Sequence, residues 1–246
     1  MLEKILIIGG STAVGKSEFA LTLSKKLKME IISADSIQVY KGLKVGTSKP
    51  SEDEKKICPH HLIDIVPTNS TFNAYNFMFL SKQLITQILS RGNLPVIVGG
   101  TGLYIESLLY DYNFKKKERS NQAVYDYTLL ILNQNREKLY KKINKRVDKM
   151  IQNGLVEEVK MLKESGLIEN NQCSTAIGYK EILAYLNDEY SLECAIEKVK
   201  QNTRNYAKRQ ITWFKHMDGI WVDVDNQLEI ENAINLICAN YKNYLK

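Results

Sequence analysis

The sequence predicts an α/β protein in which a mostly parallel sheet is flanked by helices, with additional helices toward the C-terminus. Short apolar runs typical of buried strands recur along the chain, at Ile5–Ile8, Met29–Ser33, Leu94–Val98 and Ile220–Val224. Segments with helical spacing lie between or after them, at Lys16–Leu27, Ala74–Ser90, Arg136–Ser165, Leu192–Lys215 and Leu228–Tyr244. Buried strands that alternate with helices are typical of a parallel sheet.

The composition agrees with one globular domain over residues 1–246. A chain of 246 residues can bury a large core, and 44% hydrophobic and 25% charged residues are ordinary proportions for such a domain. No segment approaches the roughly 18 apolar residues that a membrane span needs, and the first residues do not resemble a secretory signal. We therefore expect a monomer of the cytoplasm with no membrane partner. The four widely spaced cysteines form no Cys-x-x-Cys pair, which predicts reduced structural thiols rather than zinc ligands.

The first predicted strand leads into a phosphate-binding loop. Gly10, Gly15, Lys16 and Ser17 complete the pattern G-x-x-x-x-G-K-[ST] between that strand and the first predicted helix. In such a P-loop the backbone N–H groups point at phosphate oxygens, the lysine adds a cation and the hydroxyl suits Mg²⁺. The fold is therefore expected to be P-loop NTPase-like. The residues expected to bind the phosphate groups are Gly10, Ser11, Thr12, Ala13, Val14, Gly15, Lys16 and Ser17.

The next two predicted strands leave open which phosphate this loop holds. An NTPase of this kind usually has an apolar strand that ends in an acid, which helps to hold the metal. The strand Leu94–Val98 is followed instead by GGTGLY, without a carboxylate, whereas Asp35 follows the strand Met29–Ser33. An ATPase or a small-molecule kinase stays open at this point, although the sequence shows no arginine-rich lid for ATP. The other interpretation is a diphosphate that does not belong to ATP.

The helices predicted for the second half of the chain are strongly basic. Residues 136–149 hold seven Lys or Arg against two acids, and residues 196–217 hold six against one, within a net charge of +6. Arg146 lies beside the apolar seam of its helix, so it can line a cleft. Lys200, Arg204 and Lys208 recur every four residues; this stripe suits a phosphodiester backbone and equally a plain amphipathic helix.

Six further segments share a family pattern and together cover most of the chain. They are ISADSIQVYKGLKVGTSKP (Ile32–Pro50), PHHLIDI (Pro59–Ile65), GGTGLYI (Gly99–Ile105), REKLYKKINKRVDKMIQNGLVEEV (Arg136–Val159), AIGYKEI (Ala176–Ile182) and TRNYAKRQITWF (Thr203–Phe214). In sequence and order they resemble the tRNA dimethylallyltransferases, also called tRNA isopentenyltransferases. These enzymes prenylate an adenosine beside the anticodon.

The resemblance implies a prenyltransferase reaction and the residues that carry it. Family enzymes bind dimethylallyl diphosphate at the P-loop with Mg²⁺, here on Ser17. They transfer its dimethylallyl group to the exocyclic amine of the adenosine 3′-adjacent to the anticodon and release diphosphate. Asp35 corresponds to the general base, with a metal ligand or helix cap as the alternative, and Arg146 to the arginine that stabilises the leaving group. Thr101 is expected to donate a hydrogen bond near the reacting groups, or else only to cap the following helix.

The same resemblance implies that the anticodon stem-loop of a tRNA binds with its adenosine flipped out of the stack. The Gln38 amide is expected to read an edge of the adenine, whereas His60 and His61 are expected to be structural. The residues expected to contact tRNA are Asp35, Ser36, Ile37, Gln38, Thr101, Thr175, Ala176, Ile177, Gly178, Tyr179, Lys180, Lys208, Arg209, Gln210, Ile211, Thr212, Trp213, Phe214 and Lys215.

The chain departs from the family mildly at the start of the P-loop, where Gly-Ser-Thr replaces the usual Gly-Pro-Thr, and strongly in one later stretch. Typical members carry a long, mostly helical insertion after GGTGLY that grips the anticodon stem, and nearly all of it is missing here, around residues 113–124. The polar stretch 113–122 is expected to be an exposed loop. The short form leaves two alternatives open, an adenylate isopentenyltransferase that acts on free AMP or a related nucleotide, and a non-catalytic RNA-binding remnant. The remnant is disfavoured by the intact Lys16, Ser17, Asp35, Thr101 and Arg146.

Overall fold

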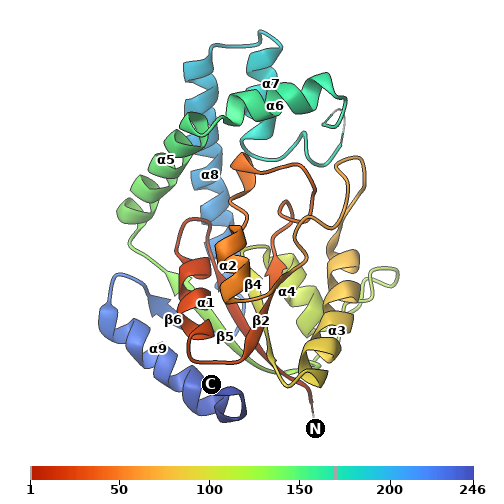
Figure 1. Cartoon of the computed structure of the whole chain (residues 1–246), viewed down its shortest axis with the longest axis vertical. Helices are drawn as coiled ribbons and strands as arrows, with labels where there is room; N and C mark the ends of the chain where they lie inside the picture. Colours follow the sequence, from red (N-terminus) through yellow and green to blue (C-terminus); the bar gives the residue numbers. More distant parts are fainter. Residues whose placement is uncertain (1, 169–170) are drawn as a thin grey trace.

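The computed structural model describes residues 2–168 and 171–246, with a parallel six-stranded sheet at the centre (Figure 1). The strands are β1 (Lys4–Gly10), β2 (Met29–Ala34), β3 (His60–His61), β4 (Leu94–Gly99), β5 (Asp126–Asn133) and β6 (Ile220–Asp223). The helices are α1 (Lys16–Ser24), η1 (Val45–Thr47), α2 (Glu52–Ile57), α3 (Ala74–Ser90), α4 (Gly102–Leu109), α5 (Arg136–Gln152), α6 (Leu155–Glu164), α7 (Tyr179–Leu186), α8 (Leu192–Phe214), α9 (Gln227–Asn240) and η2 (Lys242–Tyr244). The strand order is β3-β2-β4-β1-β5-β6, so β1 and its phosphate loop lie inside the sheet.

Alternate residues of the strands pack against helices on opposite faces of the sheet. On one face Ile5 and Ile7 join the core formed with α3 and α4. On the other face Leu6 and Ile8 join the core formed with α1, α5 and α9. All four side chains are fully buried, which explains why this strand reads as a continuous apolar run rather than as an alternating one.

The helices α5, α6, α7 and α8 extend past the C-terminal edge of the sheet, at the top of Figure 1. The long helix α8 packs on α5 and α7 and then descends to the sheet. Its Ala207 belongs to the core on the α1 side, whereas Phe214 belongs to the core on the α4 side. Helix α8 therefore passes over the edge at which the phosphate loop lies.

The predicted fold class is confirmed, and each of the four predicted strands is found. Strands β3 and β5 were missed: β3 is only two residues long, and β5 contains the apolar run Leu129–Leu132, which is itself a strand signal. The single helix expected over Arg136–Ser165 is wrong. It is interrupted between α5 and α6, because Gly154 adopts φ 92°, outside the helical range. No described helix is long and apolar enough to span a bilayer.

A buried carboxylate on β2 joins this strand to β3 and to the turn between α3 and β4. Glu30 accepts hydrogen bonds from Arg91 Nε (2.9 Å) and Arg91 Nη2 (2.8 Å) and from Asn93 Nδ2 (2.8 Å), and it lies 2.7 Å from His61 Nε2. Burial alone would raise the pKa of Glu30, but these hydrogen bonds outweigh it and lower the pKa to about 2. His61 is therefore structural, as expected.

We predict that Glu30→Gln lowers the free energy of unfolding by about 2 kcal/mol at pH 7, because it removes the buried charge that Arg91 faces. A depressed folded-state pKa stabilises the fold above pH 4.5, and this contribution is lost as the pH falls toward 2. Urea unfolding of both proteins at several pH values measures the difference, which is expected to shrink below pH 4.5. Glu189→Gln, at an exposed position, is the matched control. A difference that stays the same from pH 7 to pH 3 would contradict this role.

Candidate active site

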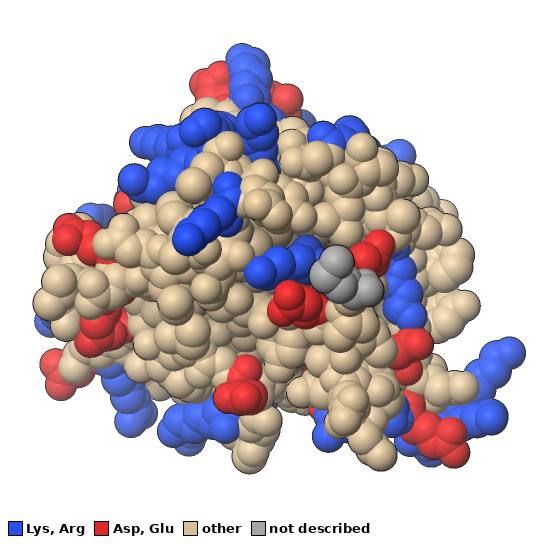
Figure 2. Space-filling model, turned by 90° about the horizontal axis from the view of Figure 1, so that it is seen from below, with Lys and Arg blue, Asp and Glu red and all other residues tan. Residues whose placement is uncertain are grey.

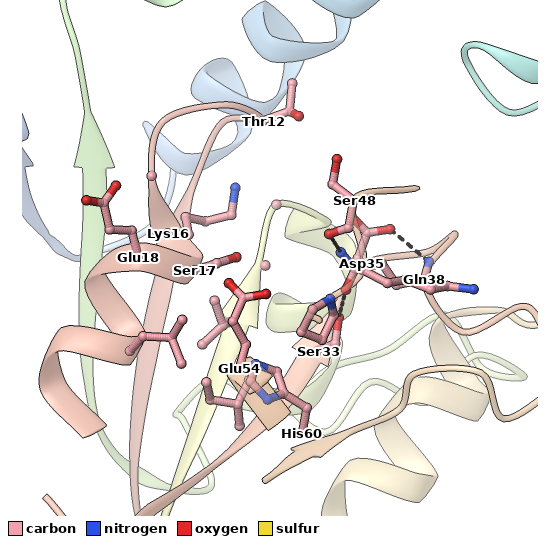
Figure 3. A pocket seen from close by; sticks show the side chains of 18 of the residues that line it. Thr12, Lys16, Ser17, Glu18, Ser33, Asp35, Gln38, Ser48, Glu54 and His60 are labelled. Atoms are coloured by element: carbon pink, nitrogen blue, oxygen red, sulfur yellow. Dashed lines mark hydrogen bonds between the residues drawn. The ribbon is translucent and has the colours of Figure 1, made fainter. Parts of the chain in front are cut away.

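A cavity of about 770 Å³ lies at the C-terminal edge of the sheet, where the loops after β1, β2 and β4 meet (Figure 3). These loops contribute Lys16, Asp35 and Gly100, while α5 and α8 contribute Arg146 and Tyr206. The carboxyl ends of parallel strands are the usual position for a ligand site in open α/β sheets. The fold thus gathers the predicted phosphate loop, the predicted base and the predicted arginine around one space.

The loop after β1 has the backbone of a phosphate cradle. Gly10 adopts φ 138°, and a Cβ there would lie 2.5 Å from the carbonyl oxygen of Leu132. Gly15 adopts φ 107° at the N-cap position of α1. Both values lie in the region that favours glycine, so the motif residues are required by the backbone itself. Among the described residues no side chain caps α1, which leaves its first-turn N–H groups available to an anion.

Two cations line the phosphate loop. The Lys16 ammonium donates to the carbonyl oxygens of Gly10 (3.0 Å) and Ser11 (2.7 Å), and the side chain points into the cavity in Figure 3. Arg146 Nη1 donates to Thr12 Oγ1 (3.2 Å), so α5 is attached to the loop. Burial lowers the pKa of Lys16 to about 8, against the opposing effect of Asp35. Burial also lowers the pKa of Arg146, which as a guanidinium stays charged.

Asp35 follows β2 directly and enters the cavity from another side than Lys16 (Figure 3). Its Oδ1 accepts hydrogen bonds from the backbone N–H groups of Ile37 (2.8 Å) and Gln38 (3.2 Å). These bonds stabilise a turn, and they fix the direction of the carboxylate. Oδ2 accepts no hydrogen bond from any residue that the structure describes, so it is free to take a proton or a ligand group.

Two side chains of α8, Tyr206 and Gln210, complete the cavity. Gln210 was expected to contact tRNA, whereas Tyr206 had no predicted role. The buried Gln210 accepts a hydrogen bond from Thr12 N (2.8 Å) and donates one to Gly100 O (3.0 Å), so it joins two active-site loops. Burial and then the negative charge of Asp35 raise the pKa of Tyr206 to about 12, which keeps it a neutral donor. Both residues stand in the TRNYAKRQITWF segment, four positions apart on one helix face.

The Thr101 hydroxyl has no well-aligned hydrogen-bond partner in the described part of the chain. Thr101 occupies the N-cap position of α4, but its side chain makes no capping hydrogen bond. Its Oγ1 is buried and lies near the Tyr206 hydroxyl, but it makes no well-aligned hydrogen bond with any described residue. The capping alternative is therefore wrong, and the hydroxyl beside Gly100 is available to a bound ligand. A buried polar atom without a partner is unfavourable, so such an atom in a folded protein calls for an explanation.

Comparison with known proteins identifies the family. A sequence model described as "IPP transferase" matches residues 38–125 and 113–217. The chain belongs to the IPP transferase family. It is 39% identical to the tRNA dimethylallyltransferase of Anoxybacillus flavithermus, over 96% of each chain, and 36% identical to that of Alkaliphilus oremlandii, over 99% of each.

Solved structures share the fold of this IPP transferase. The tRNA isopentenylpyrophosphate transferase of Staphylococcus epidermidis is 34% identical with a TM-score of 0.88, over 97% of this chain and 99% of that one. The corresponding protein of Bacillus halodurans is 34% identical with a TM-score of 0.89, over 96% of each chain. The alignment with the Alkaliphilus relative spans 309 positions against 246 residues here, so that relative holds a stretch without a counterpart. The two segments matched by the family model meet at residues 113–125, where the missing insertion was placed.

The segment after Asp35 is held in place by Gln38. The Gln38 amide accepts a hydrogen bond from Ser33 Oγ (2.9 Å) and donates to the carbonyl oxygens of Thr47 and Ser48 (both 3.2 Å). Figure 3 shows this side chain turned toward Ser33 and Ser48. Reading an adenine edge, as expected for Gln38, would require these bonds to open. Ser36 and Ile37 are half-buried beside it.

The segment Thr175–Lys180 lies outside the cavity, at the start of α7. Thr175 and Lys180 are exposed, whereas Tyr179 is fully buried and donates from its hydroxyl to Glu158 Oε1 (2.7 Å). The Tyr179 side chain is therefore not available to RNA in this structure, and it acts as a support for the segment. A tRNA contact by the exposed members of the segment stays a prediction.

The predicted basic stripe of α8 is divided into two parts. Lys200 lies 2.9 Å from Asp148 on α5 and 2.9 Å from Glu197 on its own helix. Arg204 donates to Asn144 Oδ1 on α5 (2.6 Å), so both side chains join α8 to α5. Lys208, Arg209 and Lys215 are exposed and form no ion pair with the described residues. In the rest of this segment Phe214 is fully buried, and Trp213 is 39% exposed.

We predict that inorganic diphosphate binds about tenfold more weakly at pH 9 than at pH 7. The Lys16 ammonium, whose pKa is about 8, loses its proton over this range in the free protein, and a neutral amine no longer attracts the anion. Isothermal titration calorimetry measures the affinity. In Lys16→Arg the cation persists at both pH values, so this variant reports the titration of diphosphate alone. Equal pH dependence in the two proteins would rule out Lys16 as the titrating group.

Proposed function

We propose that this chain transfers a dimethylallyl group from dimethylallyl diphosphate to the exocyclic amine of the tRNA adenosine 3′-adjacent to the anticodon. One observation carries the proposal: a single cavity holds a phosphate loop with two cations and, from a different strand, a carboxylate with a free oxygen. Its relatives support it, since those from Anoxybacillus and Alkaliphilus are named tRNA dimethylallyltransferase. A further structural neighbour, 25% identical with a TM-score of 0.87, is a eukaryotic dimethylallyltransferase acting on tRNA.

The proposed reaction is a substitution at the carbon that carries the diphosphate. The adenine amine forms a C–N bond to this carbon, and the C–O bond breaks with its electron pair going to the diphosphate. Asp35 takes the proton that the amine loses, through the oxygen that the Ile37 and Gln38 N–H groups leave free. The loop N–H groups, Lys16 and Arg146 stabilise the charge that develops on the leaving group.

The expected Mg²⁺ fits the donors of the phosphate loop only in part. Ser17 offers one exposed hydroxyl, which makes no hydrogen bond to the described residues. No group of three or more His, Cys, Asp or Glu side chains in the described residues could enclose a metal. Mg²⁺ usually keeps several waters and binds through few protein ligands plus phosphate oxygens, so Ser17 and the diphosphate together would hold it. When bound, it would neutralise charge on the diphosphate.

The substrate side of the proposal rests on α8 and the segment after Asp35. Lys208, Arg209 and Lys215 offer exposed cations on the helix whose Tyr206 and Gln210 line the cavity. An adenosine inside a stacked loop cannot reach that cavity, so the proposal includes a base that leaves its stack. It also includes a cytoplasmic location and a monomeric state, which both stay predictions.

The deciding experiment supplies radiolabelled dimethylallyl diphosphate and Mg²⁺ to the protein, with unmodified tRNA and with free AMP in parallel. Label in the tRNA supports the proposal and shows that the compact chain suffices. Label only in the nucleotide would assign the chain to the adenylate class instead. Label in neither acceptor would leave an RNA-binding protein without catalytic activity.

We predict that Asp35→Asn lowers the turnover of tRNA at least 100-fold while the affinity for diphosphate changes less than about threefold. The amide keeps the Oδ1 acceptor for Ile37 and Gln38, so the turn persists, but it cannot take the proton. Single-turnover transfer and calorimetry measure the two properties. Lys16→Ala is the contrasting variant, in which the affinity for diphosphate falls as well. Equal loss of both properties in both variants would contradict the assigned roles.

Thr101→Val tests the free hydroxyl. Valine has the shape of threonine and removes an unpaired buried oxygen, so we expect the free energy of unfolding to stay equal or to rise by up to about 1 kcal/mol. Turnover is expected to fall about tenfold, because the transition state loses a hydrogen-bond donor. Urea unfolding and single-turnover assays measure the two effects. Unchanged turnover would show that the hydroxyl takes no part in the reaction. A clear loss of stability would show that it has a hydrogen-bond partner within the protein.

A further inference from the structure

A second hollow, of about 540 Å³, lies between α8 and the connection that runs from α4 to β5. Each wall carries an aromatic ring and an arginine. Trp213 and Arg209 stand on α8, and Tyr110 and Arg119 stand on the connection. Flat rings next to guanidinium groups are the combination with which proteins bind unpaired nucleotides, because a base stacks on the ring and a phosphate meets the cation.

Both walls are held in position by contacts within the protein. The Trp213 indole lies against Gly102 so closely that a Cβ there would come within 2.2 Å of the ring. The Arg119 guanidinium lies 5.1 Å from the centre of the Tyr110 ring and forms an ion pair with Glu106. The backbone N–H of Ser120 donates to Tyr110 O (2.7 Å), which closes the connection onto the end of α4. The hollow is thus preformed rather than dependent on a mobile side chain.

The hollow adjoins the reaction cavity. Gly100 lines the cavity, and Gly102 lies beneath Trp213, so only Thr101 separates the two contacts. Two residues of backbone span at most about 7.2 Å. On α8, the Arg209 guanidinium lies 5.7 Å from the centre of the ring of Tyr206, which lines the cavity. The distance between the two spaces therefore suits consecutive nucleotides of one RNA strand.

We propose that this hollow binds the nucleotide next to the reacting adenosine, with its base on Trp213 and its phosphate near Arg209 and Arg119. The proposal rests on the proposed function, since it requires an RNA substrate. Arg119 comes from the short connection at which this chain lacks a stretch found in its relatives. This connection therefore supplies an RNA contact of its own. Figure 2 views the molecule from below and shows acidic and basic side chains around a broad uncharged area.

The first test removes the arginine of the connection. The probe is an RNA stem-loop of 17 nucleotides with an unmodified, unpaired adenosine, and fluorescence anisotropy measures its affinity in the presence of diphosphate and Mg²⁺. We expect Arg119→Ala to weaken binding about tenfold and to reduce the slope of log affinity against log salt by about one. Lys116→Ala is the matched control. This variant removes one positive charge from the same loop, but the Lys116 side chain lines neither the reaction cavity nor the hollow. We expect it to change the affinity less than twofold.

A second variant separates contact with RNA from support of the loop. Glu106→Gln removes the negative charge from the hollow and releases Arg119, so we expect RNA affinity to rise about threefold. If the ion pair only supports the loop, Arg119→Ala and Glu106→Gln will lose RNA affinity equally, which would overturn the proposal. Wild-type affinity in Arg119→Ala would overturn it as well.

The RNA itself supplies the third test. An abasic residue placed on one side of the reacting adenosine, and then on the other, removes the stacking partner of Trp213 without any change in the protein. One of the two positions is expected to cost about tenfold in affinity. No loss at either position would overturn the proposal. If the wild-type protein binds this RNA but does not prenylate it, the proposed function is contradicted. The affinity measurements would still show whether the hollow binds the neighbouring nucleotide.

Discussion

The active site of this IPP transferase depends on one buried amide. Gln210 accepts a hydrogen bond from the phosphate loop at Thr12 and donates one to the loop after β4 at Gly100. Both contacts fall at the edge of the sheet that α8 crosses, so one side chain sets the distance between the diphosphate position and the loop that carries Thr101. Gly100 has no side chain, and a Cβ there would lie 2.1 Å from the Gln210 amide. The close approach of α8 to this loop therefore requires both the Gln210 amide and a glycine at position 100.

Around this junction the charges are arranged for a reaction that separates charge. Lys16 and Arg146 lie beside the phosphate loop, whereas the free oxygen of Asp35 comes from β2. Burial destabilises the charged form of both cations, and an incoming diphosphate would compensate for that. Tyr206 stays neutral beside Asp35, so it can donate a hydrogen bond without competing for the proton. The cavity thus presents cations on one side and a free carboxylate oxygen on the other.

The connection between α4 and β5 is short, and it is closed by Arg119 against Glu106 and Tyr110. The two segments that match the family model overlap in this connection, and the Alkaliphilus relative aligns over 309 positions against 246 residues here. Part of the basic stripe on α8 is used within the protein, because Lys200 and Arg204 bind α5. Lys208, Arg209 and Lys215 remain exposed toward the C-terminal end of α8. Further exposed lysines lie on α5, at Lys141, Lys142, Lys145 and Lys149.

The sequence by itself determined the fold class, the phosphate loop, and the Asp35 and Arg146 that line one cavity with it. Each of these depends on local rules, such as apolar runs, glycines at positive φ, or spacing along one helix. The sequence did not determine the two-residue strand β3, the break at Gly154, or the commitment of Gln38 and Tyr179 to protein hydrogen bonds. Nor did it show that Gln210 joins two loops, or that the Thr101 side chain makes no capping hydrogen bond to α4. The tertiary structure decided most of these points, because they depend on which atoms of other segments reach a side chain or a strand edge once the chain has folded.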